Sequence, residues 1–163
     1  MDLEKEKEAI NRRKVVNKMK LEHLLQAYKV NNINANLKEN INEEEERAGV
    51  INFANGISAS YLLDDEDIVV AMKIFFNCLV PDEKGKLTVT NQVEHTIKII
   101  TIIQKTMMLL SNIPQKEANM ILEKLGLFDN TFRRGKQIKH LEHEYRIEVV
   151  DGLLCFSTNE INN

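Results

Sequence analysis

Residues 130–158, NTFRRGKQIKHLEHEYRIEVVDGLLCFST, combine a basic stretch with two short apolar runs around the dipeptide Asp151-Gly152. Asn130 or the preceding Asp129 can cap a helix, and the basic stretch predicts one that continues to about Tyr145. The runs YRIEVV and LLCFST predict two strands, because β-branched and aromatic residues favour strands and Asp-Gly tolerates the positive φ angles of a two-residue turn. This stretch therefore predicts a helix followed by a β-hairpin.

The predicted helix has an apolar side and a polar side. Ile138, Leu141 and Tyr145 fall on one side, where we expect them to dock on the core together with Phe132. On the other side, arginine can bind guanine and glutamine can bind adenine through paired hydrogen bonds, while lysine can hold phosphate. The candidate DNA-binding residues of this region are Arg133, Arg134, Lys136, Gln137, Lys139, His140 and Arg146.

Two further helices are predicted just before this stretch. Asn91 and Glu94 form a capping-box pattern at the start of a long apolar run that ends near Ser111. The run contains many β-branched residues, but its length without turn residues favours a buried helix over a strand. Pro114 and Gly126 frame the next helix, since proline suits the first turn and glycine the position after the last.

Helices are also predicted for the first half of the chain. Residues 1–30 predict a basic amphipathic helix, and residues 31–41 an asparagine-rich connector. Residues 42–86 predict a helical region with acidic residues at two helix starts, 43–46 and 64–67, where the helix dipole favours negative charge. We thus expect a mainly α fold with a C-terminal β-hairpin, in which this helical part precedes a second unit, residues 87–158, and a tail, residues 159–163.

The order of elements over residues 91–157 resembles that of a winged helix-turn-helix DNA-binding domain. TIIQKTMMLLSN matches the supporting helix, IPQKEANMILEKLGLF the first helix of the pair and its turn, DNTFRRGKQIKHLEHEY the recognition helix and RIEVVDGLLCFS the wing. The resemblance rests on order and spacing rather than on an invariant motif. It implies a winged-helix-like unit that reads DNA with its third helix.

Charge is strongly segregated along the chain. The 163 residues carry a net charge of −3, yet residues 10–29 hold six lysines and arginines against one glutamate, and residues 39–67 hold nine acidic residues against one arginine. A secondary basic patch comprises Arg12, Arg13, Lys14 and Lys18. The basic ends favour nucleic acid or an acidic partner, and the long N-terminal helix favours a homodimer that places two reading heads on successive half-sites.

Other features favour binding to protein instead of DNA. Gly135 weakens the middle of the predicted recognition helix, Glu142 and Glu144 bring negative charge to its end, and the predicted wing has little positive charge besides Arg146. The leading hypothesis is a small DNA-binding transcriptional regulator of a phage, a plasmid or a low-GC bacterium. The alternative is a non-enzymatic helical interaction module, such as a phage- or plasmid-encoded modulator of a host protein or an assembly component.

No sequence motif indicates catalysis. His140, His143 and Glu144 could offer metal ligands on one face of the predicted helix, but a site needs a further ligand that nothing indicates, so we expect neither metal nor cofactor. Cys78 and Cys155 lie among apolar residues and are expected to be reduced core cysteines. The charged first residues, with no apolar run long enough for export or for a membrane span, predict a cytoplasmic protein.

Overall fold

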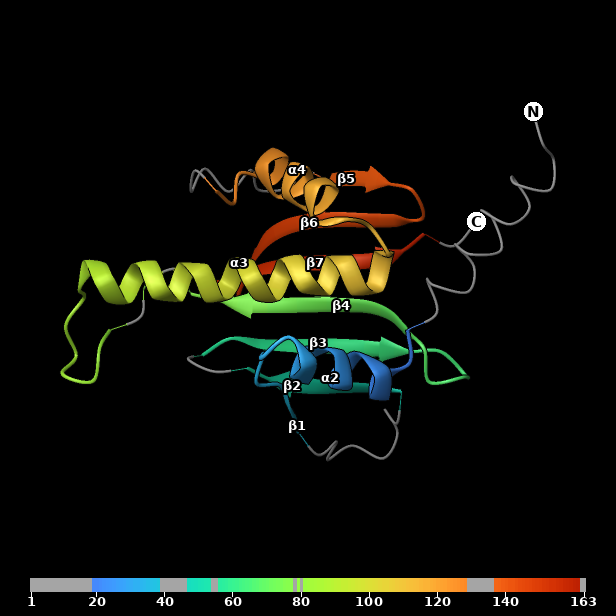
Figure 1. Ribbon diagram of the computed structural model, residues 1–163, viewed down its shortest axis with the longest axis horizontal. Helices are drawn as coiled ribbons and strands as arrows, with labels where there is room; N and C mark the ends of the chain where they lie inside the picture. The colour runs from blue at the N-terminus through green and yellow to red at the C-terminus, as the bar shows by residue number, and fades with distance from the viewer. Residues whose placement is uncertain are drawn as a thin grey trace.

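The computed structural model describes residues 19–38, 47–53, 56–77, 79, 81–128 and 137–161. Three helices and seven strands lie in these ranges (Figure 1). In chain order the elements are α2 (Leu21–Val30), β1 (Asn36–Lys38), β2 (Ala48–Asn52), β3 (Ser58–Leu63), β4 (Val69–Phe76), α3 (Val89–Ser111), α4 (Gln115–Leu125), β5 (Gln137–His140), β6 (His143–Val150) and β7 (Leu153–Glu160).

The strands form one antiparallel sheet in the order β1-β2-β3-β4-β7-β6-β5. The first four strands are a meander, the last three are a second meander, and β4 pairs with β7 to join them. In this central pair Ile74 lies opposite Phe156 and Met72 lies opposite Thr158. Because the two helices α3 and α4 separate the meanders in sequence, this pairing is the long-range contact that makes a single sheet.

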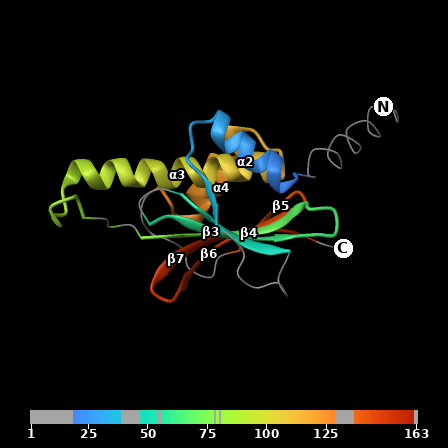
Figure 2. The same cartoon turned by 90° about the horizontal axis from the view of Figure 1, so that it is seen from below.

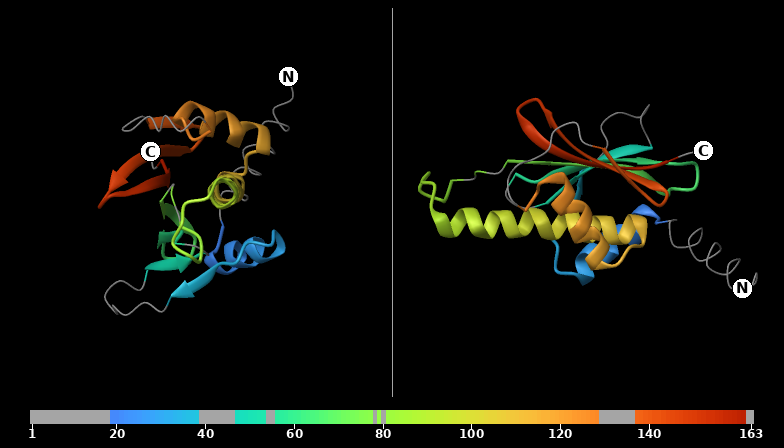
Figure 3. Two further views of the ribbon diagram at one scale, coloured as in Figure 1. Left: turned by 90° about the vertical axis from the view of Figure 1, so that its left-hand side faces the viewer. Right: turned by 90° about the horizontal axis from the view of Figure 1, so that it is seen from above.

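All three helices lie on the same side of the sheet (Figure 2). The longest helix, α3, runs across the middle strands, and a view along its axis shows α2 on one side and α4 on the other (Figure 3). In Figure 1, α2 lies over the first meander and α4 over the second. The other face of the sheet, which we call the outer face, carries no helix of the described residues.

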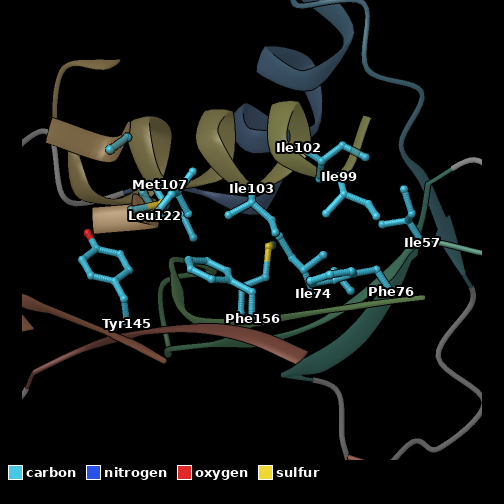
Figure 4. Close-up of a cluster of buried hydrophobic side chains, with 14 of the residues drawn as sticks. Ile57, Ile74, Phe76, Ile99, Ile102, Ile103, Met107, Leu122, Tyr145 and Phe156 are labelled. Atoms are coloured by element: carbon cyan, nitrogen blue, oxygen red, sulfur yellow. The ribbon is translucent and has the colours of Figure 1, made fainter. Parts of the chain in front are cut away.

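The core fills the space between α3 and the inner face of the sheet (Figure 4). Every second residue of a strand points inward, so Ile74 and Phe76 of β4 reach the same layer as Phe156 of β7. The helix supplies Ile103 and Met107, both fully buried. Buried isoleucines recur on α3 at the three- and four-residue spacing of one helix face, which stabilises a long helix despite its β-branched residues.

Two buried tyrosines connect α3 to the other elements. The Tyr28 hydroxyl of α2 lies 2.5 Å from the Thr106 hydroxyl of α3 and 3.7 Å from the Met72 sulfur of β4. On the other side of the core, the Tyr145 hydroxyl of β6 donates a hydrogen bond to the Ser111 hydroxyl at the end of α3. Burial raises the pKa of Tyr145 to about 12 and raises that of Tyr28 as well, so both side chains stay protonated donors.

The prediction of a mainly α fold is wrong, because strands occupy three regions for which helices were predicted. Residues 48–52 and 58–63 form β2 and β3, residues 69–76 form β4, and residues 137–140 and 143–145 belong to β5 and β6. In β4 the sequence VVAMKIFF is rich in β-branched and aromatic residues, which pack well on a pleated surface. The predicted helix starts at residues 42–46 and 129–136 lie outside the described residues.

Asp64 shows why an acidic cluster was taken for a helix start. Its side-chain oxygen Oδ1 accepts hydrogen bonds from the backbone N–H groups of Glu66 and Ile68, at 2.8 Å and 3.0 Å. The chain then turns at Asp67, whose φ is 64°, and continues into β4. A carboxylate that caps a helix by accepting backbone N–H groups stabilises a tight turn in the same way, so the residue type does not distinguish the two structures.

The predicted recognition helix is replaced by a hairpin over its described part. Leu141 has a φ of 55° in the two-residue turn between β5 and β6, and His140 pairs with His143 across that turn. Ile138 and Tyr145 lie opposite each other on the two strands, which brings together the apolar residues whose spacing predicted one helix face. Leu141 is instead 52% exposed.

Several predicted elements are confirmed. The long apolar run that ends near Ser111 forms α3, although Thr88 rather than Asn91 caps the helix. The next predicted helix is α4, which ends at Gly126 with a φ of 80°. The Asp151-Gly152 turn joins β6 to β7 with positive φ at both residues, and the C-terminal part of the first predicted helix is α2. No helix in the described ranges is long and apolar enough to cross a bilayer.

The hydrogen bond between Tyr28 and Thr106 can be tested with a double-mutant cycle. Thr106→Val keeps the side-chain shape but leaves the buried Tyr28 hydroxyl with only a weak sulfur acceptor, which should cost about 1–3 kcal/mol of unfolding free energy. Adding Tyr28→Phe should then cost less than it does in the wild type, by about 1 kcal/mol. Urea unfolding measures each value, with Thr96→Val, half-buried on the same helix, as control. Strictly additive losses would show that the two hydroxyls do not stabilise each other.

Candidate functional site

The outer face of the sheet is the most distinctive surface of the described residues. Its side chains follow from the strand registers: Val50, Ser60, Lys73, Ser157 and Arg146 occupy one row across β2, β3, β4, β7 and β6. A neighbouring row begins with small and apolar residues on β2 to β4 and continues with polar ones on β7 and β6. That second row is Ala48, Leu62, Ala71, Asn159 and Glu144.

A hollow of about 410 Å³ lies over the β2–β4 part of this face. Ala48 and Ala71 line it with the exposed side chains of Val50 and Leu62, and Leu62 is 52% exposed. The two alanines have the shortest apolar side chains, so the surface is low between the longer neighbours. This hollow is therefore an apolar depression on a sheet face that no described helix covers.

On the inner side of β2 and β3, Gly49 leaves room for the side chain of Tyr61. They lie opposite each other on β2 and β3, and the Tyr61 ring occupies the space that a Cβ on residue 49 would need. Burial raises the pKa of Tyr61, in agreement with a ring held on the inner face. Glycine is thus the residue that allows the aromatic ring to lie across β2.

Lys73 supplies positive charge beside the hollow. It is exposed, it lies between Ser60 and Ser157 in its row, and within the described part of the chain it forms no ion pair. On the neighbouring strand β7, Cys155 is buried on the same face, and burial raises the pKa of its thiol to about 11 although Lys73 acts in the opposite direction. Cys155 is consequently a thiol rather than a reactive thiolate near neutral pH.

The β5–β6 part of the outer face is charged and internally paired. Arg146 lies between Glu144 and Glu148 on β6, at 3.1 Å and 2.8 Å from their carboxylate oxygens. It also donates a hydrogen bond of 3.3 Å to the side chain of Gln137 on β5. The hydrogen bond to Glu148 and the two carboxylates raise the pKa of Arg146. A partner that binds Arg146 must compete with both glutamates.

The structure separates the residues that the sequence nominated for DNA binding. Gln137, Lys139 and Arg146 lie together on the outer face, whereas His140 lies on the inner face and its Nε2 is 2.9 Å from a carboxylate oxygen of Glu117 on α4. The other nominated residues lie outside the described residues. They are Arg133, Arg134 and Lys136, and the secondary patch of Arg12, Arg13, Lys14 and Lys18.

The potential metal ligands His140, His143 and Glu144 do not converge. The two histidines lie opposite each other on β5 and β6, but Glu144 follows His143 directly and points to the other face. Within the described residues, no cluster of three or more His, Cys, Asp or Glu side chains could hold a metal ion. The three nominated side chains therefore do not form one site.

Sequence reasoning missed the residues of the hollow because it placed them on helices. The helical spacing of Val50, Phe53, Ala54, Ile57 and Tyr61 favoured a helix over the residues that form β2 and β3. The signal available in the sequence was the two-residue alternation of polar and apolar residues over 58–61 (SASY) and 72–74 (MKI). Comparison with models of known protein families, with curated proteins and with solved structures finds no significant match.

The buried His143 makes stability depend on pH in a predictable direction. It stacks 6.4 Å from Tyr145, faces His140 and Glu160 across its two neighbouring strands, and burial lowers its pKa below 6.5 while Glu142 opposes this shift. As pH falls below 6.5, His143 of the unfolded chain therefore binds a proton before His143 of the folded chain does. The free energy of unfolding decreases over this pH range.

The expected result is that His143→Gln unfolds with a smaller loss of stability between pH 7.5 and pH 5 than the wild type, by roughly 1 kcal/mol. Urea unfolding at both pH values measures this, and the exposed His23→Gln serves as the control. An identical pH dependence in the wild type and in His143→Gln would contradict the assigned role of His143.

Proposed function

We propose that this chain is a non-enzymatic protein-binding module whose outer face binds an apolar, carboxylate-bearing segment of a partner protein. The observation that supports the proposal is the apolar hollow over the β2–β4 part of the outer face. Exposed apolar surface is favourable to bury, at about 25 cal/mol per Å². Leu62, the alanines on either side of it in its row, and Val50 offer such surface in one place.

The shape of the hollow supports a protein partner over a small molecule. Its volume of about 410 Å³ is in the range of ligand sites, but such sites usually bury most of the ligand in a cleft. Here the lining side chains stand on the face of a sheet, and the neighbouring rows continue with polar residues. A partner that extends beyond the hollow can bury its apolar side chains there and form hydrogen bonds with the surrounding row.

Lys73 determines the expected charge of the partner segment. Lys73 lies in register between Ser60 and Ser157, and it lines the apolar hollow. A carboxylate at this point can accept charge-assisted hydrogen bonds while its neighbouring side chains enter the hollow. The partner segment should therefore combine apolar residues with an Asp or Glu.

DNA binding is the second proposal, and one observation favours it. Gln137, Lys139 and Arg146 share the outer face of β5 and β6, so three nominated residues could contact one nucleic-acid surface. The two glutamates that hold Arg146 weaken this proposal, since they repel phosphate. A role as a transcriptional regulator, a homodimeric state and an absence of enzyme activity stay predictions of the sequence.

Selection from a displayed library of random peptides tests the protein-binding proposal. We expect enriched peptides to contain apolar residues around an acidic one, and a synthetic copy to bind at least about tenfold more weakly to Leu62→Asp and several-fold more weakly to Lys73→Gln. Val30→Asp is the matched control, because Val30 is 72% exposed on α2, away from the outer face.

Fluorescence anisotropy of the labelled peptide measures these affinities. Equal affinity for the wild type and for Leu62→Asp would overturn the assignment of the hollow, as would a selection that enriches no peptide. In parallel, salt-dependent binding to mixed double-stranded DNA that is lost in Lys139→Ala/Arg146→Ala would favour the second proposal.

A further inference from the structure

A second surface that no described element covers lies at the N-terminal half of α3, which projects past the ends of the strands (Figures 1 and 2). The exposed side chains of Val89, Val93 and Ile97 form its centre, at 82%, 52% and 58% exposure. They are four residues apart, so they form one continuous ridge along the helix. We call these three residues the α3 ridge.

The α3 ridge lies in the stretch of sequence where exposed large hydrophobic residues are most frequent among the described ranges. Thirteen large hydrophobic residues are exposed in these ranges, and five of them lie between positions 79 and 97, where Leu79 and Leu87 accompany the ridge. Further along α3, the corresponding side of the helix faces α4, and Gln104 donates a 2.6 Å hydrogen bond to Asn119 there. The ridge thus continues a helix-packing surface beyond the point where the described α4 covers it.

We propose that the α3 ridge binds the same ridge of a second copy of this chain, with the two helices antiparallel. In such a pair a two-fold axis at the level of residue 95 places Val93 of each copy at the height of Ile97 of the other. Ridges of residues four apart interdigitate in the commonest class of helix packing. The ridge is therefore complementary to itself, as a two-fold interface requires.

The charges beside the ridge are complementary in the same arrangement. Glu94 and Lys98 lie on one flank of the ridge, four residues apart on α3. In a two-fold antiparallel pair the same flank of both helices meets. Because α3 rises about 1.5 Å per residue, Glu94 of one copy lies within roughly 3 Å, along the axis, of Lys98 of the other. Two such Glu-Lys contacts then border the paired apolar residues.

The proposed contact between the two copies is small, so we expect dimerisation to be weak. Three ridge residues per copy and two flanking ion pairs bury less than the roughly 1,600 Å² of a standard stable interface. A dissociation constant on the order of micromolar is therefore expected, with the dimer forming as concentration rises. The outer face lies on the opposite side of the sheet from α3, so this contact is separate from the proposed binding of a partner segment.

Sedimentation equilibrium from about 1 µM to about 1 mM tests the proposal on the full chain. The wild type should pass from monomer to dimer, and Val93→Asp/Ile97→Asp should weaken dimerisation at least about 100-fold while its circular dichroism stays unchanged. Leu62→Asp is the matched control and should dimerise as the wild type does. A monomer at the highest concentration, or a dimer unaffected by the double substitution, would overturn the proposal.

A charge exchange tests the antiparallel arrangement without touching the ridge. Glu94→Lys alone and Lys98→Glu alone should each dimerise several-fold more weakly, because like charges then meet across the pair. An equimolar mixture of the two variants should form a heterodimer more tightly than either forms a homodimer, since every flanking contact becomes attractive. A mixture that associates no better than its components would refute the antiparallel register, whatever the stability of each variant.

Discussion

The pairing of β4 with β7 is the constraint on which the rest of the structure depends. It joins two meanders that α3 and α4 separate in sequence, and its inward residues Ile74 and Phe156 lie opposite each other beneath α3. A pairing across so long a loop costs chain entropy before any contact compensates for it. The apolar layer between α3 and these two strands supplies that compensation, so the sheet and its covering helix depend on each other.

The buried hydroxyl pairs make this layer specific. Apolar burial depends mainly on the area removed from water and has no preferred direction, so it specifies the position of α3 less sharply than a buried hydrogen bond does. Tyr28 and Tyr145 come from opposite halves of the molecule, and each finds its hydroxyl partner at one position of α3, Thr106 and Ser111. A shift of the helix would leave buried hydroxyls unpaired, which costs about 1–3 kcal/mol for each. These pairs therefore fix where α3 lies along the sheet.

The sequence predicted elements with strong local signals and failed where the fold depends on distant pairing. Pro114, Gly126 and Asp151-Gly152 mark their helix and hairpin because capping and turn chemistry act within a few residues. In contrast, Ile138 and Tyr145 have the spacing of a helix face but meet across a hairpin. Strand propensity depends mostly on neighbours that belong to other strands, and the partners of β4 lie on β3 and on the distant β7.

The same limitation applies to the candidate site. Lys139 was nominated on the predicted helix and Arg146 on the predicted wing, and they share a face because β5 and β6 pair, while His140 is turned inward by strand alternation. The hollow could not be predicted before the strands were known, because Ala48, Leu62 and Ala71 come together only through their registers.

Helices on one face of the sheet also explain why two separate surfaces are available. With α2, α3 and α4 on the inner side, the outer face keeps its apolar hollow, and α3 extends past the strands with its ridge uncovered by the described helices. If two copies associate through α3, both outer faces remain free. A partner with two suitable segments could then bind both copies at once, and the second segment would bind at a high effective concentration. Low affinity of the hollow for one segment and low affinity between the two copies would together give a high overall affinity for such a partner. Modest affinity at either surface alone is therefore compatible with a function in complex formation.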